Sequence, residues 1–302
     1  MIHTPVLLDE VLSVFRGLKD GVVVDCTLGY SGHSSALLEQ NRDINLIGCD
    51  RDETAINYSK KKLEKYKDRV QIYHSAFSEI LSKLEISEIR AILADIGVSS
   101  LQLDRNDRGF SLNSDTLDMR MDRDQSKDAK FIVNSYSVDE LADIFWKYGE
   151  LKDANFIAKK IVDAREKSEI TSAKELVDII GLAPVRKGGI SKATLAFQAL
   201  RIEVNDELVE LTTLLTNIKN LGLTNCLVAV ITFHSLEDRI VKNTFKEWSK
   251  ECVCPEFFMR CECGGKNALG EIVTKKAITA SANEIAQNSR SRPAKLRVFK
   301  IK

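Results

Sequence analysis

The sequence has no long apolar run, no low-complexity tract and no internal repeat. Its longest stretch without a charged residue, residues 220–236, is 17 residues long and contains Asn and Thr. A membrane helix needs about 20 mostly apolar residues. The first ten residues also lack a basic segment followed by an apolar one, which a secretory signal would have. We therefore expect a cytoplasmic protein that neither crosses nor enters a membrane.

The chain also has no excess of positive or negative charge, and its number of cysteines is odd. Seven cysteines without an export signal indicate reduced thiols rather than a disulfide framework. Of the 302 residues, 44% are hydrophobic and 29% are charged, as in ordinary globular proteins. This length suits one large domain or two ordinary ones.

The zero net charge hides an uneven distribution. Residues 211–302 contain 15 basic and 8 acidic side chains, a net charge of +7, and residues 290–302 contain six basic residues and no acid. A solvated edge strand often carries such lysines, which deter aggregation. A surface that faces nucleic-acid phosphates would carry them as well. The overall neutrality therefore does not exclude an RNA partner.

Short β-branched runs alternate with helical patterns in the first hundred residues. Strands are predicted at residues 22–26, 45–49, 70–73 and 90–95, and helices at 33–40 and 54–67. Strand–helix–strand units at this spacing imply a parallel sheet that helices cover on both faces. The first part of the chain is therefore predicted to be an α/β domain.

The alternation stops near residue 104, and no strand pattern follows until about residue 190. Ser137 and Ser172 each begin a Ser-x-x-Glu sequence, which caps helix starts, and Gly181 is a suitable helix end. A long amphipathic helix is predicted for residues 191–221. Further strands are predicted at 227–233, 271–278 and 295–301, with a helix up to residue 248. The predicted domains are thus 1–104 and 191–302, which together form one α/β domain, and an inserted helical domain at 105–190.

Ligands of open α/β sheets bind at the carboxyl ends of the strands. The first predicted strand brings Asp25 to its end, before a turn with Gly29 and Gly32, and Asp50 directly follows the second. Asp50 is placed to accept hydrogen bonds from both ribose hydroxyls of an adenosine. A dinucleotide site would have a third glycine in place of Thr27, and its diphosphate would be repelled by Asp25. A cofactor with a cationic amino-acid end, such as S-adenosylmethionine, fits better, although two glycines can also form a mere turn.

Several separated motifs together resemble one family. They are residues 3–10 (HTPVLLDE), 25–34 (DCTLGYSGHS), 50–52 (DRD), 95–104 (DIGVSSLQLD), 108–111 (RGFS), 117–122 (LDMRMD), 233–242 (FHSLEDRIVK) and 290–292 (RSR). From residue 4 to the C-terminus the chain resembles the bacterial ribosomal RNA small-subunit methyltransferase H family, also called MraW. The resemblance implies a Rossmann-like class I S-adenosylmethionine-dependent methyltransferase fold with an inserted helical substrate-recognition domain. It also implies methylation of the N4 amine of a specific cytidine in 16S rRNA, at the decoding centre (P-site region) of the small ribosomal subunit.

The resemblance implies a set of cofactor-binding residues. These are Ser31, Gly32, His33, Asp50, Phe77, Asp95 and Gln102. Two positions depart from the family pattern, because Ser31 replaces the first glycine of Gly-Gly-His and Leu101 replaces the proline of Ser-Ser-Pro-Gln. Ser31 can still offer its backbone N–H if the position does not need a positive φ. Loss of the proline loosens the loop without changing the chemistry.

The implied reaction needs a group that accepts a proton, because cytosine N4 must lose one when it gains a methyl group. Asp95 is the candidate catalytic residue, although it can instead contact the cofactor or cap its loop. His234 can orient the substrate, act as a base or simply satisfy a hydrogen bond. A base taken out of its stack needs an apolar surface, and Phe110, Trp146 and Tyr148 are possible platforms, each more typical of a core.

Four cysteines fall within twelve residues: Cys252, Cys254, Cys261 and Cys263. Four thiolates suit a structural Zn²⁺ site, although the Cys-x-Cys spacing is tighter than the usual Cys-x₂-Cys. Unligated thiols are the alternative, and in neither case is a catalytic role expected.

Two other functions remain open on the sequence. One is methylation of cytosine N4 in DNA, and the other is an RNA-binding assembly factor that has kept the fold and lost turnover. The sequence leaves the oligomeric state and the need for an assembled ribosomal subunit open.

Overall fold

The computed structural model describes residues 5–84, 88–186, 189–255 and 260–302, and it divides into two compact units. The first unit comprises Met1–Gly97 and Glu210–Lys302, and the second is Val98–Val209. The second unit is larger than the predicted insertion at 105–190, because helix α9 (Lys192–Asn205) packs into its apolar core. Residues 3 and 4 of the first family motif lie outside the described residues.

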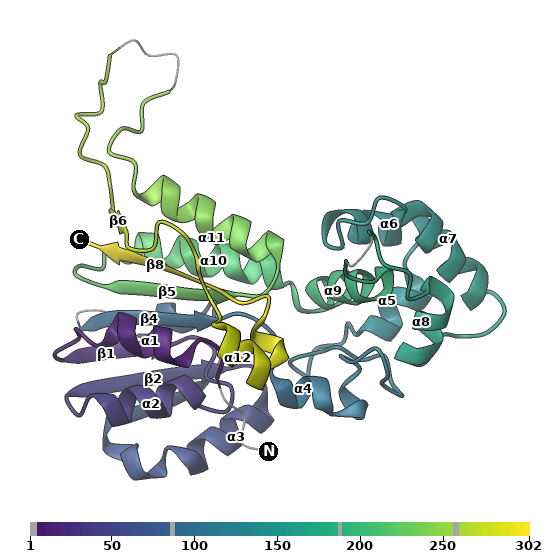
Figure 1. The fold of residues 1–302 in the computed structure, drawn as a ribbon, viewed down its shortest axis with the longest axis horizontal. Coiled ribbons are helices and arrows are strands. Elements are labelled where there is room, and N and C mark those ends of the chain that lie inside the picture. The colour runs from purple at the N-terminus through teal and green to yellow at the C-terminus, as the bar shows by residue number, and fades with distance from the viewer. Residues whose placement is uncertain (1–4, 85–87, 187–188, 256–259) are drawn as a thin grey trace. The chain divides into compact units, whose positions relative to one another are not determined.

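The first unit is built on one mostly parallel sheet (Figure 1). Its strands are β1 (Gly21–Asp25), β2 (Ile44–Asp50), β3 (Val70–His74), β4 (Ile89–Asp95), β5 (Leu227–Thr232), β6 (Gly270–Ile272), β7 (Ile278–Thr279) and β8 (Lys295–Ile301). Their order is β3-β2-β1-β4-β5-β8-β6, with β7 also paired to β8. The first five strands are parallel and β8 is antiparallel. The predicted mostly parallel α/β fold is confirmed, and its strand order reverses between β1 and β4, where such sheets bind ligands.

Both faces of the sheet are buried by helices. The helices of this unit are α1 (Leu8–Phe15), α2 (Gly32–Gln40), α3 (Glu53–Lys62), α10 (Glu207–Asn220), of which Glu210–Asn220 belongs here, α11 (Ser235–Trp248) and α12 (Ala282–Gln287). Val23 belongs to the apolar cluster with α1 and α2, and Val24 to the cluster with α10 and α11. Successive β1 side chains point to opposite faces, which explains why β1 reads as a continuous apolar run.

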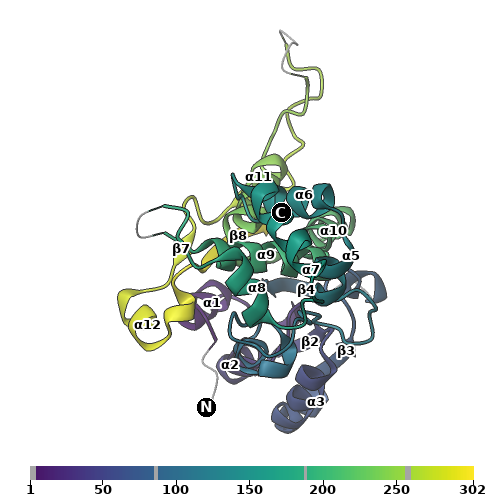
Figure 2. The same ribbon diagram turned by 90° about the vertical axis from the view of Figure 1, so that its right-hand side faces the viewer.

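Helices α1 and α12 lie side by side although they are far apart in the sequence (Figures 1 and 2). The backbone N–H at Leu7 donates a hydrogen bond to Glu284 Oε1 at 2.8 Å. The C-terminal region therefore supports the chain segment that leads into β1.

Three predicted elements are interrupted in the structure. The helix predicted for residues 54–67 ends with α3, and a 3-10 segment, Glu64–Arg69, follows it with a kink at Tyr66. The helix predicted for residues 191–221 is two helices, since Asp206 has a left-handed φ of 51° between α9 and α10. The strand predicted for residues 271–278 is the two short strands β6 and β7, which pair with different parts of β8.

Among the described residues of the second unit, the regular elements are helices apart from one isolated bridge between Pro184 and Ser191, and residues 109–128 form turns and loop. Its α-helices are α4 (Ser100–Asp104), α5 (Ala129–Ser135), α6 (Val138–Lys147), α7 (Ala154–Arg165), α8 (Ala173–Ile180) and α9, followed by the first turn of α10. The capping boxes predicted at Ser137 and Ser172 are present, and Gly181 ends α8. Among the described residues, every helix of the protein is too short or too polar to span a membrane.

Candidate active site

The carboxyl ends of β1, β2 and β4 bring three carboxylates to one edge of the sheet. Asp25, Asp50 and Asp95 are the last residues of these strands. Asp25 pairs with Gly48 of β2 and with Leu93 of β4, so the three strand ends are level to within two residues. This edge is the candidate active site, because the strand order reverses between β1 and β4.

Asp50 is held in place by the glycine turn after β1. Gly29, at a φ of 48°, donates its backbone N–H to Asp50 Oδ2 at 2.8 Å. The backbone N–H at Asp52 donates to the other oxygen, Oδ1, also at 2.8 Å. Burial raises the pKa of Asp50. The backbone N–H of Arg51 is a third donor to this carboxylate, which leaves about one of its four acceptor positions for a ligand hydroxyl.

Ser31 adopts the conformation that the missing glycine of the family pattern would favour. Its φ is 56°, its side chain is fully buried, and its Oγ has no hydrogen-bond partner among the described residues. Its backbone N–H donates to Leu28 O at 2.7 Å and so serves the turn. Ser31 is expected to offer this N–H to a ligand only if its φ is not positive. Because its φ is positive, that condition is not met.

Replacing Ser31 by Gly is expected to raise the free energy of unfolding by about 1 kcal/mol, because glycine relieves the left-handed backbone strain and removes an unpartnered hydroxyl. Thermal unfolding of the two proteins measures this difference. Ser35→Gly, in the first turn of α2, is the control and should lower stability by about 1 kcal/mol, since glycine weakens a helix. A Ser31→Gly variant no more stable than the wild type would show that the turn is not strained.

Gly32 and His33 shape the start of α2 against the N-terminal segment. A Cβ at Gly32 would lie 2.6 Å from Pro5 Cγ, so only glycine fits there. His33 is buried, its Nε2 is 2.9 Å from Val6 O, and its Nδ1 is 3.7 Å from Asp95 Oδ2. The structure thus brings His33 to Asp95, while Gly32 contacts packed protein atoms.

Of the three carboxylates at the strand ends, Asp95 has the fewest hydrogen bonds to its side-chain oxygens. Its Oδ1 is buried and has no hydrogen-bond partner among the described residues. Its backbone N–H donates to Thr27 Oγ1 at 2.7 Å, which fixes the end of β4 beside the turn. Burial, followed by repulsion from Asp25 and Glu237, raises the pKa of Asp95 to about 8. Asp95 Oδ1 therefore has unused acceptor capacity that a ligand donor would satisfy.

Asp25 supports this arrangement from the end of β1. Its Oδ2 accepts a hydrogen bond from Ser34 Oγ at 2.5 Å, and its Oδ1 accepts one from the Thr27 N–H at 3.1 Å. Burial raises its pKa to about 6 despite these two bonds. Thr27 and Ser34 thus orient the carboxylate of Asp25, and Thr27 also holds the backbone at Asp95.

Phe77 and Gln102 lie on different parts of the fold. Phe77 follows β3 and packs, half-buried, against the apolar cluster that contains residues of α10 and α11. Gln102 belongs to the second unit, where its Oε1 accepts from the Ser99 N–H at 3.0 Å and its own N–H donates to Ser99 Oγ. This capping box starts α4 without the family's proline.

His234 lies before α11 and is paired with a buried acid that sequence reasoning missed. Its Nε2 is 2.9 Å from Oε1 of Glu237, which is fully buried. Glu237 Oε2 also accepts from the backbone N–H groups of Phe233, at 2.7 Å, and His234, at 3.2 Å. The signal was present, since an acid at the third position of a helix commonly caps its start.

The three possible platforms for a base differ in exposure. Phe110 is buried, with the Arg108 guanidinium 5.9 Å from its ring centroid, and Tyr148 is half-buried. Trp146, on α6, is 60% exposed, so the expectation that it belongs to the core is wrong.

The basic C-terminal segment is not an edge strand. Strand β8 lies between β5 and β6, which excludes that explanation of its lysines and arginines. Lys295 and Arg297 contact Asp238 of α11, at 3.1 Å and 2.7 Å. These two cations share one carboxylate within the first unit, and a phosphate would compete with Asp238 for them.

The residues at the strand ends fit a cationic ligand better than an anionic one. Asp25, Asp50 and Asp95 all have raised pKa values, which a positive ligand would lower again. A diphosphate would add negative charge beside them. These three carboxylates therefore suit an adenosine cofactor with a sulfonium and an ammonium group.

Comparisons with known proteins identify the family. The model of the MraW methylase family matches residues 1–302. Ribosomal RNA small subunit methyltransferase H of Campylobacter concisus is 62% identical over 303 residues, covering 99% of this chain and 98% of the relative. The protein of the same name from Campylobacter fetus is 56% identical over 299 residues, covering 99% and 97%.

Among solved structures, an rRNA methylase from Streptococcus thermophilus matches 100% of this chain and 98% of its own, with 10% identity and a TM-score of 0.38. That likeness is too weak to add to the fold described above. The family match confirms the resemblance seen in the sequence motifs and, with it, the prediction of S-adenosylmethionine as cofactor. The chain belongs to the MraW methylase family.

Proposed function

We propose that this protein transfers the methyl group of S-adenosylmethionine to the N4 amine of a specific cytidine in 16S rRNA, at the decoding centre of the small ribosomal subunit. The names of its relatives support ribosomal RNA of the small subunit as the substrate. The motifs of the family support the cytidine and its position. The reaction takes place in the cytoplasm, where small subunits are assembled.

The observation that carries the proposal is the unpartnered Oδ1 of Asp95. The exocyclic amine of cytosine donates hydrogen bonds, and Asp and Glu side chains accept them. Bound at this oxygen, N4 would lie at the strand ends, beside the glycine turn and Asp50. Asp95 thus fits a substrate amine rather than a carbonyl or a phosphate.

The chain contributes positioning and a proton acceptor. S-adenosylmethionine, when bound, supplies a methyl carbon to which N4 bonds while the carbon–sulfur bond breaks and its electron pair stays on sulfur. Asp50 holds a ribose hydroxyl, and Asp95 orients N4 and accepts its proton. A base with a pKa near the working pH is the most effective acceptor, and that of Asp95 is about 8 before ligands bind. Holding the two reactants in line supplies most of the remaining rate.

The second unit is assigned to substrate recognition. Its described surface includes Trp146, which is 60% exposed, and Phe156, which is 64% exposed. Exposed aromatic rings stack on unpaired bases. Recognition by this unit would leave the strand ends of the first unit to hold the cofactor, although Gln102, one of the implied cofactor-binding residues, belongs to the second unit.

The test uses labelled S-adenosylmethionine and small subunits from cells that lack this enzyme. Label in 16S rRNA, recovered as N4-methylated cytidine after nuclease digestion and mass spectrometry, is the expected result. Label in duplex DNA in place of rRNA would favour the DNA methyltransferase. Binding to the subunit without transfer would favour the assembly factor. Asp43→Asn, which changes an exposed carboxylate outside the site, is the control and should react like the wild type.

A further inference from the structure

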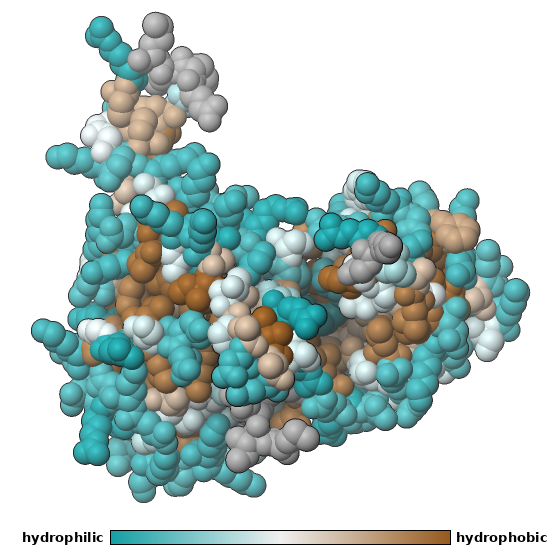
Figure 3. Space-filling model, in the orientation of Figure 1, coloured by the Kyte–Doolittle hydropathy of each residue, from teal (hydrophilic) through white to brown (hydrophobic). Residues whose placement is uncertain are grey.

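The segment between α11 and β6 carries four cysteines and has no core of its own. It projects from the first unit (Figures 1 and 3). None of its described residues, 249–255 and 260–269, is buried. Apolar packing therefore does not explain why the segment folds back so that its cysteines meet.

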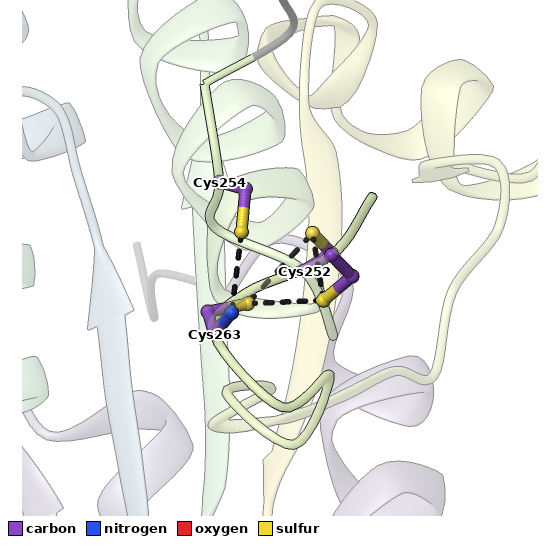
Figure 4. Close-up of side chains that lie close together, drawn as sticks. Cys252, Cys254 and Cys263 are labelled. Atoms are coloured by element: carbon purple, nitrogen blue, oxygen red, sulfur yellow. Dashed lines mark hydrogen bonds between the residues drawn. The ribbon is translucent and has the colours of Figure 1, made fainter. Parts of the chain in front are cut away.

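The four sulfur atoms nevertheless lie together. The Sγ atoms of Cys252 and Cys261 are 3.5 Å apart, those of Cys261 and Cys263 are 3.5 Å apart, and those of Cys263 and Cys252 are 3.7 Å apart. With Cys254, all four lie within 4.8 Å of one another. Figure 4 shows the sulfur atoms of the labelled cysteines turned toward a common point. The three short distances far exceed the length of a disulfide bond, about 2.0 Å.

Backbone N–H groups of each Cys-x-Cys pair donate to a sulfur of the other pair. Cys254 Sγ accepts from the N–H groups of Glu262, at 3.2 Å, and Cys263, at 3.3 Å. Cys263 Sγ accepts from the Val253 N–H at 3.4 Å. These bonds favour thiolates and fix the two halves of the loop relative to each other.

We propose that Cys252, Cys254, Cys261 and Cys263 bind one structural Zn²⁺ ion. A tetrahedral site with Zn–S bonds of about 2.3 Å separates its sulfur atoms by about 3.8 Å, close to the spacing of the three closest pairs. Four thiolates with no open position give a closed site, so the ion has no part in methyl transfer. The ion stabilises the loop, whose described residues form no hydrophobic core.

The charges of the loop support this stabilising role. Residues 250–266 contain three basic and three acidic side chains. A loop that binds RNA through phosphates would carry an excess of basic residues. The zinc site is therefore independent of the proposed reaction. Whether or not zinc binds, the proposal of methyl transfer is unaffected.

The test measures metal in the full chain, purified without a chelating tag from zinc-supplemented cells. We expect about one zinc per chain, and less than about 0.2 in the Cys252→Ser and Cys263→Ser variants, which remove ligands. Cys226→Ala is the matched control, because Cys226 is a buried cysteine outside the loop, and it should keep its zinc. X-ray absorption should show four sulfur neighbours at about 2.3 Å.

A second measurement works on the wild type and does not depend on variants. The exposed tryptic sites Lys250, Arg260 and Lys266 should be cut at least about tenfold faster after a chelator removes zinc, and protection should return when zinc is restored. Wild-type protein that takes up no zinc on reconstitution would overturn the proposal. Two disulfides, found by alkylation and mass spectrometry without reductant, or iron in place of zinc would also overturn it.

Discussion

Replacing Asp95 by Asn is expected to lower kcat for methyl transfer by about 10²–10⁴-fold, the usual contribution of a general base. Asn is nearly isosteric with Asp and can still accept a hydrogen bond, but it cannot take the N4 proton at neutral pH. Single-turnover rates with saturating cofactor measure the effect. The Kd of S-adenosylhomocysteine should change little. A large rise in that Kd with an unchanged rate would instead make Asp95 a cofactor ligand.

The same variant should be more stable than the wild type, which separates loss of chemistry from loss of fold. The pKa of Asp95 rises from 3.8 to about 8 on folding, so the folded state binds its proton more tightly than the unfolded state does. The stability linked to this proton is fully present below pH 4 and is lost as the pH rises toward 8.

The amide of the Asp95→Asn variant never ionises, so the variant escapes this loss. The gain in unfolding free energy should therefore be near zero at pH 4 and at least about 2 kcal/mol at pH 8, after allowance for partial exposure of the side chain. Denaturant unfolding at the two pH values checks the sign. A gain that is larger at the lower pH would contradict the raised pKa.

Replacing Asp50 by Ala is expected to weaken binding of S-adenosylhomocysteine by about 100-fold. One hydrogen bond from a ribose hydroxyl to a buried carboxylate contributes up to about 3 kcal/mol. Isothermal titration calorimetry measures the change. Asp43→Ala, which removes an exposed carboxylate just before β2, should bind like the wild type.

Asp50 also accepts the Gly29 N–H, so a second ligand is needed to separate direct contact from support of the turn. An analogue without the 2′- and 3′-hydroxyls should bind the wild type about 100-fold less tightly and bind Asp50→Ala with nearly the same weakened affinity. If the analogue lost the same factor in both proteins, the hydroxyls would not bind Asp50. In that case the residue would act only through Gly29.

Much of the fold was predictable because it depends on local patterns. Short segments rich in β-branched and other apolar residues predicted β1, β2, β3, β4, β5 and β8, and Ser-x-x-Glu predicted the starts of α6 and α8. The break at Asp206 escaped prediction because one left-handed residue leaves the apolar period on both sides intact. The division into β6 and β7 escaped it because both short strands pair with β8, which follows them in the sequence.

The sequence predicted a set of candidate site residues but not their arrangement. By itself, the amino-acid sequence determined that Asp25, Asp50 and Asp95 lie at strand ends and that four cysteines share one short segment. Only the tertiary structure decided that Ser31 takes a left-handed conformation, that Glu237 holds His234, and that Asp95 Oδ1 is left without a partner. The physical reason is that hydrophobic period and capping act within one element, whereas burial, hydrogen bonding and the pKa values that follow from them depend on neighbours brought together by the whole fold.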